Sequence, residues 1–277
     1  MWRLLVLALL VVGCSREDPA RSAPPPPRPA TPRLVALTPS ATELVLALGA
    51  GALLVGVDEY SQQPAVSHLP KVGSFLKPDL EAIIKLAPSL VIVDDVHGPA
   101  AATLHDAHIA TLECPMHDLP DVRRGLRAIA GSIDRGPDAE RVIGAIDSAI
   151  DAARRGRPAR PPRVLAVIDR EAGGLGNLVA AGPGSWVDEL LAIVGADNVL
   201  AAAGTRYPKI SVEEVLRSRP EVILDLSYVA REGIAPWLSV DVPAVTAKRV
   251  KTLTDQSLMA PSPRVADALA MLAAAVR

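Results

Sequence analysis

Two glutamates stand at the same place in two copies of a repeated segment, and their chemistry suits charged contacts with a partner. Glu81 lies in the first copy, DLEAIIKLAPSLVIVDD, and Glu213 lies in the second copy, SVEEVLRSRPEVILDLS. Each copy predicts a short helix, a proline turn and an apolar strand. The helix dipole stabilises a carboxylate in the first turn by roughly 0.3–1 kcal/mol, so helix capping alone is one interpretation. The other interpretation is that two outward carboxylates, one from each half of the chain, contact basic pockets on a two-fold symmetric partner.

The capping pattern of the second copy leaves its glutamate available to a partner. Ser211 is the expected N-cap, which makes Glu214 the capping-box residue and leaves Glu213 to point outward. In the first copy Asp79 is the expected N-cap, and Glu81 is the second helical residue, as Glu213 is. Both glutamates are therefore predicted to be exposed at helix starts.

Aromatic residues are rare, at 3% of the chain, and they form a second set that suits binding. Beyond the apolar N-terminus, most of them fall in predicted loops or at the ends of predicted elements, where α/β sheets place ligands. The six aromatic residues beyond the N-terminus are Tyr60, Phe75, Trp186, Tyr207, Tyr228 and Trp237. Aromatic faces contribute a large contact area at low entropic cost, which suits a large, flat, partly apolar ligand. Local packing is the alternative for Tyr228 and Trp237.

Strands alternate with helices in both halves of the chain, and near-continuous Val, Ile and Leu runs indicate parallel sheets covered on both faces. The pattern predicts an α/β fold with two similar lobes, each on a mainly parallel sheet, joined by a single long helix. The expected boundaries are an N-terminal lobe at 33–136, a connecting helix at 137–156 and a C-terminal lobe at 157–277. Ser40 is the expected cap of the first helix, with Glu43 as its capping-box partner. Two lobes that face one another form a cleft, and a cleft suggests a ligand.

The N-terminus has the pattern of a targeting segment. Residues 1–13 combine Arg3 with an apolar run that is shorter than the about 20 residues needed to cross a bilayer. This predicted signal peptide is followed by Cys14, and the junction resembles the lipobox of bacterial lipoproteins, which implies lipidation of Cys14. An ordinary signal peptide with a chance cysteine is the alternative. Residues 14–32 are rich in proline and are expected to form a semi-rigid tether.

Several other kinds of function are disfavoured by the sequence. The net charge of −2 gives no reason to expect a nucleic acid as partner. No GxSxG, Walker A or HExxH motif is present, so neither an enzyme nor a cofactor is expected. A metal site is not expected either, because several histidines, His117 among them, fall in the first lobe and the second lobe contains none. Asp94 and Asp95, neighbours at a strand end, are expected to point apart, and Cys114 is expected to be a buried, inert thiol.

Three stretches of the chain carry a specific resemblance to a known family. They are TPSATELVLALGAGALLVGVDEYS, LPKVGSFLKPDLEAIIKLAPSLVIV and YPKISVEEVLRSRPEVIL. From Arg33 onward the chain resembles the periplasmic substrate-binding proteins of ABC importers for cobalamin and iron-siderophores, and among them the cobalamin-binding members most. The resemblance implies that Glu81 and Glu213 meet arginines on the two permease subunits. It also implies that ATP hydrolysis belongs to separate subunits.

The same resemblance implies where a ligand binds. By position, Tyr60, Phe75 and Tyr207 match aromatic ligand contacts of cobalamin binders, and Trp186 at a helix start is a further candidate. Heme binders often place an iron-ligating tyrosine in the turn that contains Phe75 here, so heme is disfavoured. Siderophore binders often line the cleft with arginines, and three arginines stand in predicted loops. These are Arg170, Arg206 and Arg231.

The sequence therefore predicts a substrate-binding protein of the periplasm or cell envelope, lipid-anchored to a membrane. It is expected to capture cobalamin or a related corrinoid and to deliver it to an ABC permease dimer with its ATPase subunits. A ferric-siderophore-binding protein of the same family is one alternative. A lipid-anchored ligand sensor without a transport role is the other.

Overall fold

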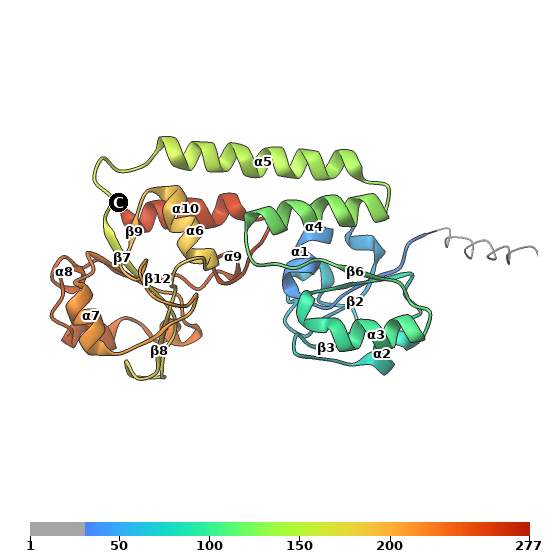
Figure 1. Cartoon of the computed structure of the whole chain (residues 1–277), viewed down its shortest axis with the longest axis horizontal. Coiled ribbons are helices and arrows are strands. Elements are labelled where there is room, and N and C mark those ends of the chain that lie inside the picture. Colours follow the sequence, from blue (N-terminus) through green and yellow to red (C-terminus); the bar gives the residue numbers. More distant parts are fainter. Residues whose placement is uncertain (1–30) are drawn as a thin grey trace, which may run out of the picture.

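The computed structural model describes residues 31–277 and shows two lobes side by side beneath a long helix (Figure 1). The predicted signal peptide, Cys14 and nearly all of the predicted tether lie outside the described residues. Within residues 31–277, no helix combines the length and the apolarity that a bilayer crossing needs. The predicted α/β fold of two similar lobes joined by one long helix is confirmed.

The N-terminal lobe is built on a four-stranded sheet in the order β2-β1-β5-β6, whose neighbouring strands all run parallel. The strands are β1 (Leu34–Ala36), β2 (Leu54–Val57), β5 (Leu90–Val93) and β6 (Thr111–Glu113). The helices are α1 (Pro39–Ala47), α2 (Leu80–Lys85), α3 (Gly98–Asp106) and α4 (Leu119–Ser132). Strand side chains alternate between the two faces of a sheet. Leu34 and Ala36 accordingly share a buried cluster with α1 and α4, whereas Val35 shares one with α2 and α3.

Short elements fill the connections of this lobe. The 3-10 helices are η1 (Gly51–Leu53), η2 (Pro64–Val66) and η3 (Asp95–His97). A hairpin of β3 (Gly73–Ser74) and β4 (Lys77–Pro78) precedes α2. The sequence predicts only a single short strand here, because two-residue strands are too short to show a periodic pattern.

The C-terminal lobe has a sheet in the order β10-β8-β7-β11-β12, with β9 paired to β7. Its strands are β7 (Arg163–Asp169), β8 (Leu178–Ala180), β9 (Asp197–Asn198), β10 (Lys209–Ile210), β11 (Val222–Asp225) and β12 (Val250–Thr252). Its helices are α6 (Trp186–Val194), α7 (Val212–Ser218), α8 (Pro243–Thr246), α9 (Gln256–Met259) and α10 (Val265–Val276), with 3-10 helices η4 (Tyr228–Glu232) and η5 (Ala235–Ser239). β11 lies between β7 and β12 and pairs with both in parallel. β8 is antiparallel to both β7 and β10. The sheet is therefore mainly parallel with an antiparallel edge.

The two lobes are joined by α5 (Gly136–Arg155), which lies across both of them (Figure 1). Its buried side chains follow helical spacing: Ala139, Val142, Ile143, Ile146 and Ile150. They pack against α4 of one lobe and α10 of the other. One buried cluster runs through α1, α4, α5, α6 and α10, so the joint is a packed helical layer and not a free linker.

The repeated segment folds alike in both lobes. Its helices are α2 and α7, its strands are β5 and β11, and the residue before each repeated proline lies in the left-handed region, with φ of 46° at Ala87 and 44° at Arg219. Asp79 and Ser211 are the N-caps, as the sequence predicts. Each copy therefore begins and ends its helix in the same way.

The predicted cap of α1 is wrong. Thr38, not Ser40, caps this helix, and its hydroxyl accepts a hydrogen bond from the Ala41 N–H at 3.0 Å. Pro39 then occupies the first helical position, where its fixed φ suits the helix and its missing N–H costs nothing. Glu43 is consequently not a capping residue and is free to contact the other lobe.

Candidate functional site

The two repeated glutamates are exposed at the second position of their helices. Glu81 follows the Asp79 cap of α2, and Glu213 follows the Ser211 cap of α7. Figure 1 shows α2 and α7 at the same side of the molecule, opposite α5. The Ser211 hydroxyl accepts a hydrogen bond from the Glu214 N–H at 3.3 Å. A hydrogen bond with the Ser211 side chain also lowers the pKa of Glu213, so the exposed carboxylate is ionised at neutral pH.

The β3–β4 hairpin presents Phe75 and Leu76 in its two-residue turn. Gly73 makes this turn possible, because its φ is +91° and an added Cβ would lie 2.5 Å from the Lys77 carbonyl oxygen. His97 holds the turn in place: its Nε2–H donates to the Phe75 carbonyl oxygen at 2.6 Å, and the two rings meet edge to face at 5.4 Å. The proton is assigned to Nε2 because Nδ1 of His97 accepts a hydrogen bond from the Asp94 N–H at 2.9 Å.

Tyr60 stands in the loop after β2, with 52% of its side chain exposed. Two buried side chains fix this loop, because Asp58 accepts hydrogen bonds from the Tyr60 N–H at 2.9 Å and from the Ser61 hydroxyl. Lys71 donates to the Ser61 carbonyl oxygen at 2.5 Å. Burial raises the pKa of Asp58. The loop is therefore held from beneath while Tyr60 faces solvent.

The C-terminal lobe divides its aromatic residues between surface and core. Tyr207 is 48% exposed before β10, and Tyr228 is 77% exposed at the start of η4. Trp186 is only 2% exposed, and its indole N–H donates to the Ser257 carbonyl oxygen at 2.8 Å. Trp237 is fully buried. Both tryptophans are core residues, so Trp186 does not offer the ligand surface that its place at a helix start predicts.

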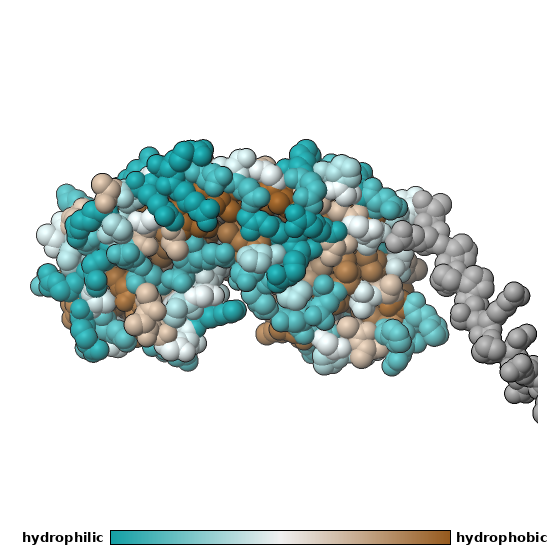
Figure 2. Space-filling view, turned by 45° about the horizontal axis from the view of Figure 1, so that its top comes forward, coloured by the Kyte–Doolittle hydropathy of each residue, from teal (hydrophilic) through white to brown (hydrophobic). Residues whose placement is uncertain are grey.

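Exposed aliphatic side chains add to this set, and sequence reasoning missed them. Leu76 is 81% exposed beside Phe75, and Val96 is 52% exposed in η3 after β5. In the other lobe Leu238 is 60% exposed in η5. Figure 2 shows a notch between the two lobes on the side away from α5. A leucine in a two-residue turn is the one sequence signal that would have pointed to Leu76, because turns favour polar residues.

A groove of about 600 Å³ lies where the lobes meet. The N-terminal lobe contributes α1 and the loop after Tyr60, and the C-terminal lobe contributes the segment that follows β12. We call this the interlobe groove, lined by Glu43, Leu46, Ala47, Gln62, Gln63, Thr254, Asp255, Gln256, Pro263 and Arg264. Both contributing loops follow the carboxyl ends of parallel strands, which is where α/β sheets place ligands.

Glu43 connects the two lobes at this groove. One of its carboxylate oxygens accepts a hydrogen bond from the Ser262 hydroxyl, and the other lies 3.3 Å from Nε of Arg264. Arg264 also donates to Asp255 at 2.9 Å. Because Glu43 is only 8% exposed, this bridge fixes how the loops on the two sides of the groove face each other.

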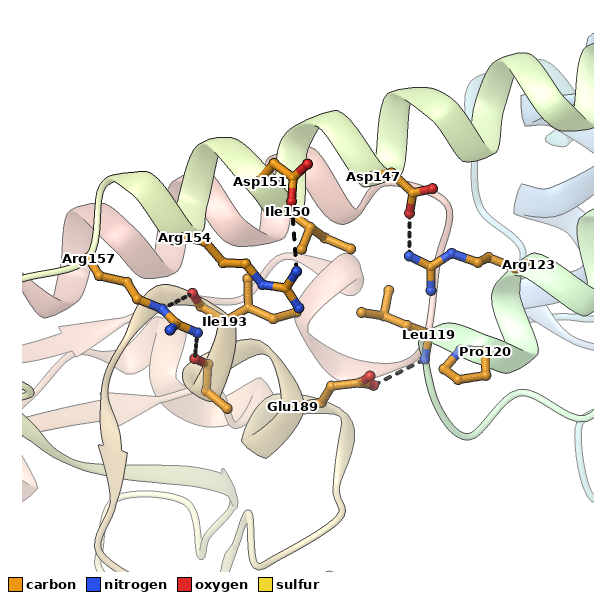
Figure 3. Close-up of a pocket in the computed structure, with 11 residues that line it drawn as sticks. Leu119, Pro120, Arg123, Asp147, Ile150, Asp151, Arg154, Arg157, Glu189 and Ile193 are labelled. Carbon is orange, nitrogen blue, oxygen red and sulfur yellow. Dashed lines mark hydrogen bonds and ion pairs between the residues drawn. The ribbon is translucent and has the colours of Figure 1, made fainter.

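A second pocket of about 640 Å³ lies beneath α5, between α4 and α6 (Figure 3). Its charged side chains are already engaged: Arg123 pairs with Asp147, and Arg154 lies 3.7 Å from Asp151. Glu189 accepts a hydrogen bond from the Leu119 N–H at 3.0 Å. Although this pocket is slightly larger, its lining comes from α4, α5, α6 and the residue Arg157 after α5, and not from loops that directly follow strands. We therefore assign the candidate site to the interlobe groove and the notch between the lobes.

Three side chains that could ligate a metal meet after β5 and β6. Asp94, Asp95 and His117 bring one ligand atom each within 4.8 Å of one another, so the two aspartates do not point apart as expected. Asp95 accepts a hydrogen bond from His117 at 2.9 Å. Burial raises the pKa of Asp94 to about 7, and the hydrogen bond with Asp94 lowers the pKa of Asp95 to about 2. The hydrogen bond to Asp95 raises the pKa of His117.

Two further predictions about single residues have a clear outcome. Cys114 is buried, with 3% of its surface exposed, so the predicted burial of this thiol is confirmed, and burial raises its pKa to about 12. Arg170 was expected in a cleft loop, but its side chain is fully buried and pairs with Asp225 at 2.7 Å. Arg206 is exposed, and the side chain of Arg231 is outside the described part.

Comparison with known proteins gives consistent matches over nearly the whole chain. The vitamin B12-binding protein of Vibrio cholerae serotype O1 is 25% identical over 278 residues, which cover 96% of this chain and 95% of that protein. The periplasmic heme-binding protein RhuT from Roseiflexus sp. RS-1, in its apo form, has a TM-score of 0.80 and 29% identity over 89% of this chain and 98% of its own. The periplasmic vitamin B12 binding protein BtuF of Vibrio cholerae shares the fold, with a TM-score of 0.76 and 23% identity over 88% of this chain and 96% of its own.

A family model also matches most of the chain. Residues 34–256 match the family described as periplasmic binding protein, and this match spans the N-terminal lobe, the connecting helix and the C-terminal lobe up to the start of α9. This is a class of substrate-binding proteins and not of enzymes, and its location is the periplasm. The chain therefore belongs to the periplasmic binding protein family.

Proposed function

We propose that this chain is the substrate-binding subunit of an ABC importer that captures a corrinoid between its lobes and delivers it to the permease. The observation that carries the proposal is the set of exposed apolar side chains on loops of both lobes, Tyr60 and Leu76 on one side and Tyr207 and Tyr228 on the other. The full-length similarity to a vitamin B12-binding protein supports it.

The chemistry of the notch suits a corrin. A corrin is a large, flat and partly apolar ring, and aromatic faces give such a ring a large contact area at low entropic cost. Tyr60, Phe75 and Tyr207 are the proposed ring contacts. Trp186 is left out because it is buried. His97 fixes the turn that contains Phe75, and Asp58 fixes the loop that contains Tyr60. Ligand binding therefore costs little conformational entropy in these two loops.

The transport partner is proposed from the two repeated glutamates. Glu81 and Glu213 are exposed on helices at the same side of the molecule, which supports simultaneous contact with two related permease subunits (Figure 1). Carboxylates at such sites pair strongly with arginine through two parallel hydrogen bonds. Lipidation of Cys14 would tether the protein to a membrane.

Heme is the second candidate ligand, because a heme-binding protein matches at 29% identity. Heme iron requires an axial ligand from the protein. The hairpin turn offers Phe75 and Leu76, neither of which can bind iron, whereas His117 is an imidazole with 42% of its side chain exposed. A ferric siderophore is less well supported, because Arg170 is buried in an ion pair.

Calorimetric titration of the purified protein separates these ligands. We expect saturable binding of cyanocobalamin at one site, with weaker or no binding of hemin and of ferric hydroxamates. Calorimetry suits this protein better than tryptophan emission, because Trp186 and Trp237 are both buried. Tight binding of hemin or a ferric hydroxamate, with no binding of cyanocobalamin, would replace the proposed ligand. Ligand binding without any affinity for a permease would favour the sensor.

A further inference from the structure

The interlobe groove collects the glutamines of this protein. The whole chain contains three glutamines, and all three line this one groove: Gln62, Gln63 and Gln256. They come from opposite lobes, because Gln62 and Gln63 follow β2 whereas Gln256 begins α9 after β12. Three amides gathered from distant parts of the chain at one groove are a shared chemical feature that the ring contacts of the notch do not explain.

The orientation of the Gln63 amide is fixed by its neighbour. Its Nε2 donates a hydrogen bond to Oε1 of Glu43 at 3.4 Å. A carboxylate held by Ser262 and Arg264 can only accept, so the amide nitrogen must face Glu43 and the amide oxygen must face away from it. That oxygen is buried and has no hydrogen-bond partner among the described residues. An unpaired buried acceptor is unfavourable, so a donor supplied by a ligand would be bound favourably there.

The charges of the groove select the kind of donor. Two carboxylates, Glu43 and Asp255, lie within ion-pair distance of one guanidinium, Arg264, whose buried Nε–H still has no hydrogen-bond partner among the described residues. The groove therefore has a formal negative excess, which repels anionic groups and accepts neutral ones. A primary amide is neutral and offers both a donor and an acceptor, which matches the donors and acceptors of the three glutamines.

We propose that the interlobe groove is a subsite for neutral primary-amide groups at the edge of the ligand. The inference rests on the proposed corrinoid function, since a corrin carries amide side chains around its ring. The subsite makes ligand choice depend on the ring's periphery as well as its face. An amide edge is accepted, and the carboxylate edge of a heme is rejected.

The test compares two ligands that differ by one group. Cyanocobalamin is titrated calorimetrically beside derivatives in which one side-chain amide is hydrolysed to a carboxylic acid. We expect the wild-type protein to bind at least one of these acids about tenfold more weakly than cyanocobalamin itself, as the loss of one to two hydrogen bonds and the added repulsion imply. Gln63→Leu and Gln256→Leu should each weaken cyanocobalamin binding about three- to tenfold and reduce the discrimination against that acid.

The control is Arg217→Leu, a polar-to-leucine change on the exposed surface of α7, far from the groove in the fold. It should leave both affinities unchanged, and the circular dichroism spectrum and melting temperature of every variant establish that it is folded. If wild type binds cyanocobalamin but treats all the acids alike, or if both glutamine variants keep wild-type affinity and discrimination, the amide subsite is wrong while the corrinoid function stands. If wild type does not bind cyanocobalamin, both proposals are wrong.

Discussion

The two copies of the repeated segment fold alike, but the acidic residues at the ends of their strands lie in different electrostatic environments. In the second copy β11 ends at Asp225, which is fully buried and accepts hydrogen bonds from Arg170 at 2.7 Å and from the Trp237 indole at 2.8 Å. In the first copy β5 is followed by Asp94 and Asp95, which form a titrating cluster with the exposed His117. The acid at the end of β11 lies in the core of its lobe, whereas the acids after β5 belong to a cluster that includes exposed side chains.

The difference teaches that a repeated pattern fixes an element and not the role of the acid at its end. Asp225 is structural because Arg170 after β7 and Trp237 in η5 reach it from outside the repeat. At Asp94, burial is the largest cause and Asp95 adds to it, so the pKa of the carboxyl rises to about 7, and the charge of His117 offsets only part of this rise.

The two copies are alike in the first helical turns of α2 and α7, where each has an exposed glutamate. The variant with the largest expected effect tests this shared position. Replacing both glutamates, in Glu81→Ala with Glu213→Ala, should abolish uptake of labelled cyanocobalamin while calorimetry shows unchanged affinity for the ligand. The physical reason is the loss of two carboxylate contacts to the permease, one per lobe. Uptake is measured in cells that contain the transporter and lack the wild-type binding protein.

Glu214→Ala is the matched control for this experiment, since it removes an acid from the same first turn of α7 that is not proposed to contact the permease. It should leave uptake unchanged. Normal uptake by the double variant would remove the docking proposal, and equal loss in the Glu214→Ala control would show that the charge of the helix start matters and not the individual position.

The copies differ most at their strand ends, where Asp225→Ala should lower the free energy of unfolding by about 3–5 kcal/mol. The substitution leaves the buried Arg170 guanidinium without its carboxylate, and an unpaired buried charge is strongly destabilising. Urea denaturation followed by circular dichroism measures the loss. A surface change after the strand of the first copy, Asp95→Ala, breaks a half-exposed pair with His117 and should cost about 1 kcal/mol or less.

A second variant makes this comparison sharper. Adding Arg170→Met to Asp225→Ala removes the stranded charge and should recover part of the lost stability. Equal stability of Asp225→Ala and Asp95→Ala would contradict the claim that the two strand ends have different roles.

These contrasts show how far the sequence determines the structure. The lobes, the long helix, the repeated caps at Asp79 and Ser211 and the buried Cys114 follow from local periodicity and capping chemistry, and all are present. The positions of Trp186 and Arg170 do not follow, because their burial depends on partners 71 and 55 residues away, Ser257 and Asp225. Tertiary partners of this kind leave no periodic signal.

The candidate site likewise combines features that the sequence predicts with features that it does not. The loop positions of Tyr60, Phe75 and Tyr207 could be inferred from their rarity and their places between elements, and two of them are about half exposed. The interlobe groove could not, since Glu43 meets Ser262 only after the chain has formed both lobes. Asp94 and Asp95 were expected to diverge because strand neighbours alternate, but they lie in η3 and at its N-cap, where that alternation ends.

The titrating cluster of the first copy predicts how stability depends on pH. The folded-state pKa of Asp94 is raised to about 7, so between about pH 4 and 7 the folded chain keeps a proton that the unfolded chain has lost. The stability of the fold must therefore fall as the pH rises through this window. The raised pKa of His117 acts in the same direction, because stability present below about pH 6.5 is lost as the pH rises through its folded value.

We expect Asp94→Asn to remove most of this dependence. Urea denaturation at pH 5 and pH 8 should show that wild type loses roughly 2–3 kcal/mol more than the variant over that interval. Asp225→Asn is an unsuitable control because it disturbs the core, whereas Asp95→Asn tests the partner that accepts from His117. Identical pH profiles for wild type and Asp94→Asn would mean that the carboxyl is not perturbed in the folded state.

The smallest expected effect distinguishes the two helix caps. Asp79 accepts from the Ala82 N–H at 3.0 Å, and Ser211 accepts from the Glu214 N–H at 3.3 Å. Asp79→Ala should cost about 1 kcal/mol of unfolding free energy, and Ser211→Ala about half as much, because only the aspartate adds a charge that the helix dipole stabilises. High salt should narrow the gap, since it screens the charge and not the neutral hydrogen bond. A larger cost for Ser211→Ala would show that its hydrogen bond with Glu213, and not the cap itself, holds the start of α7.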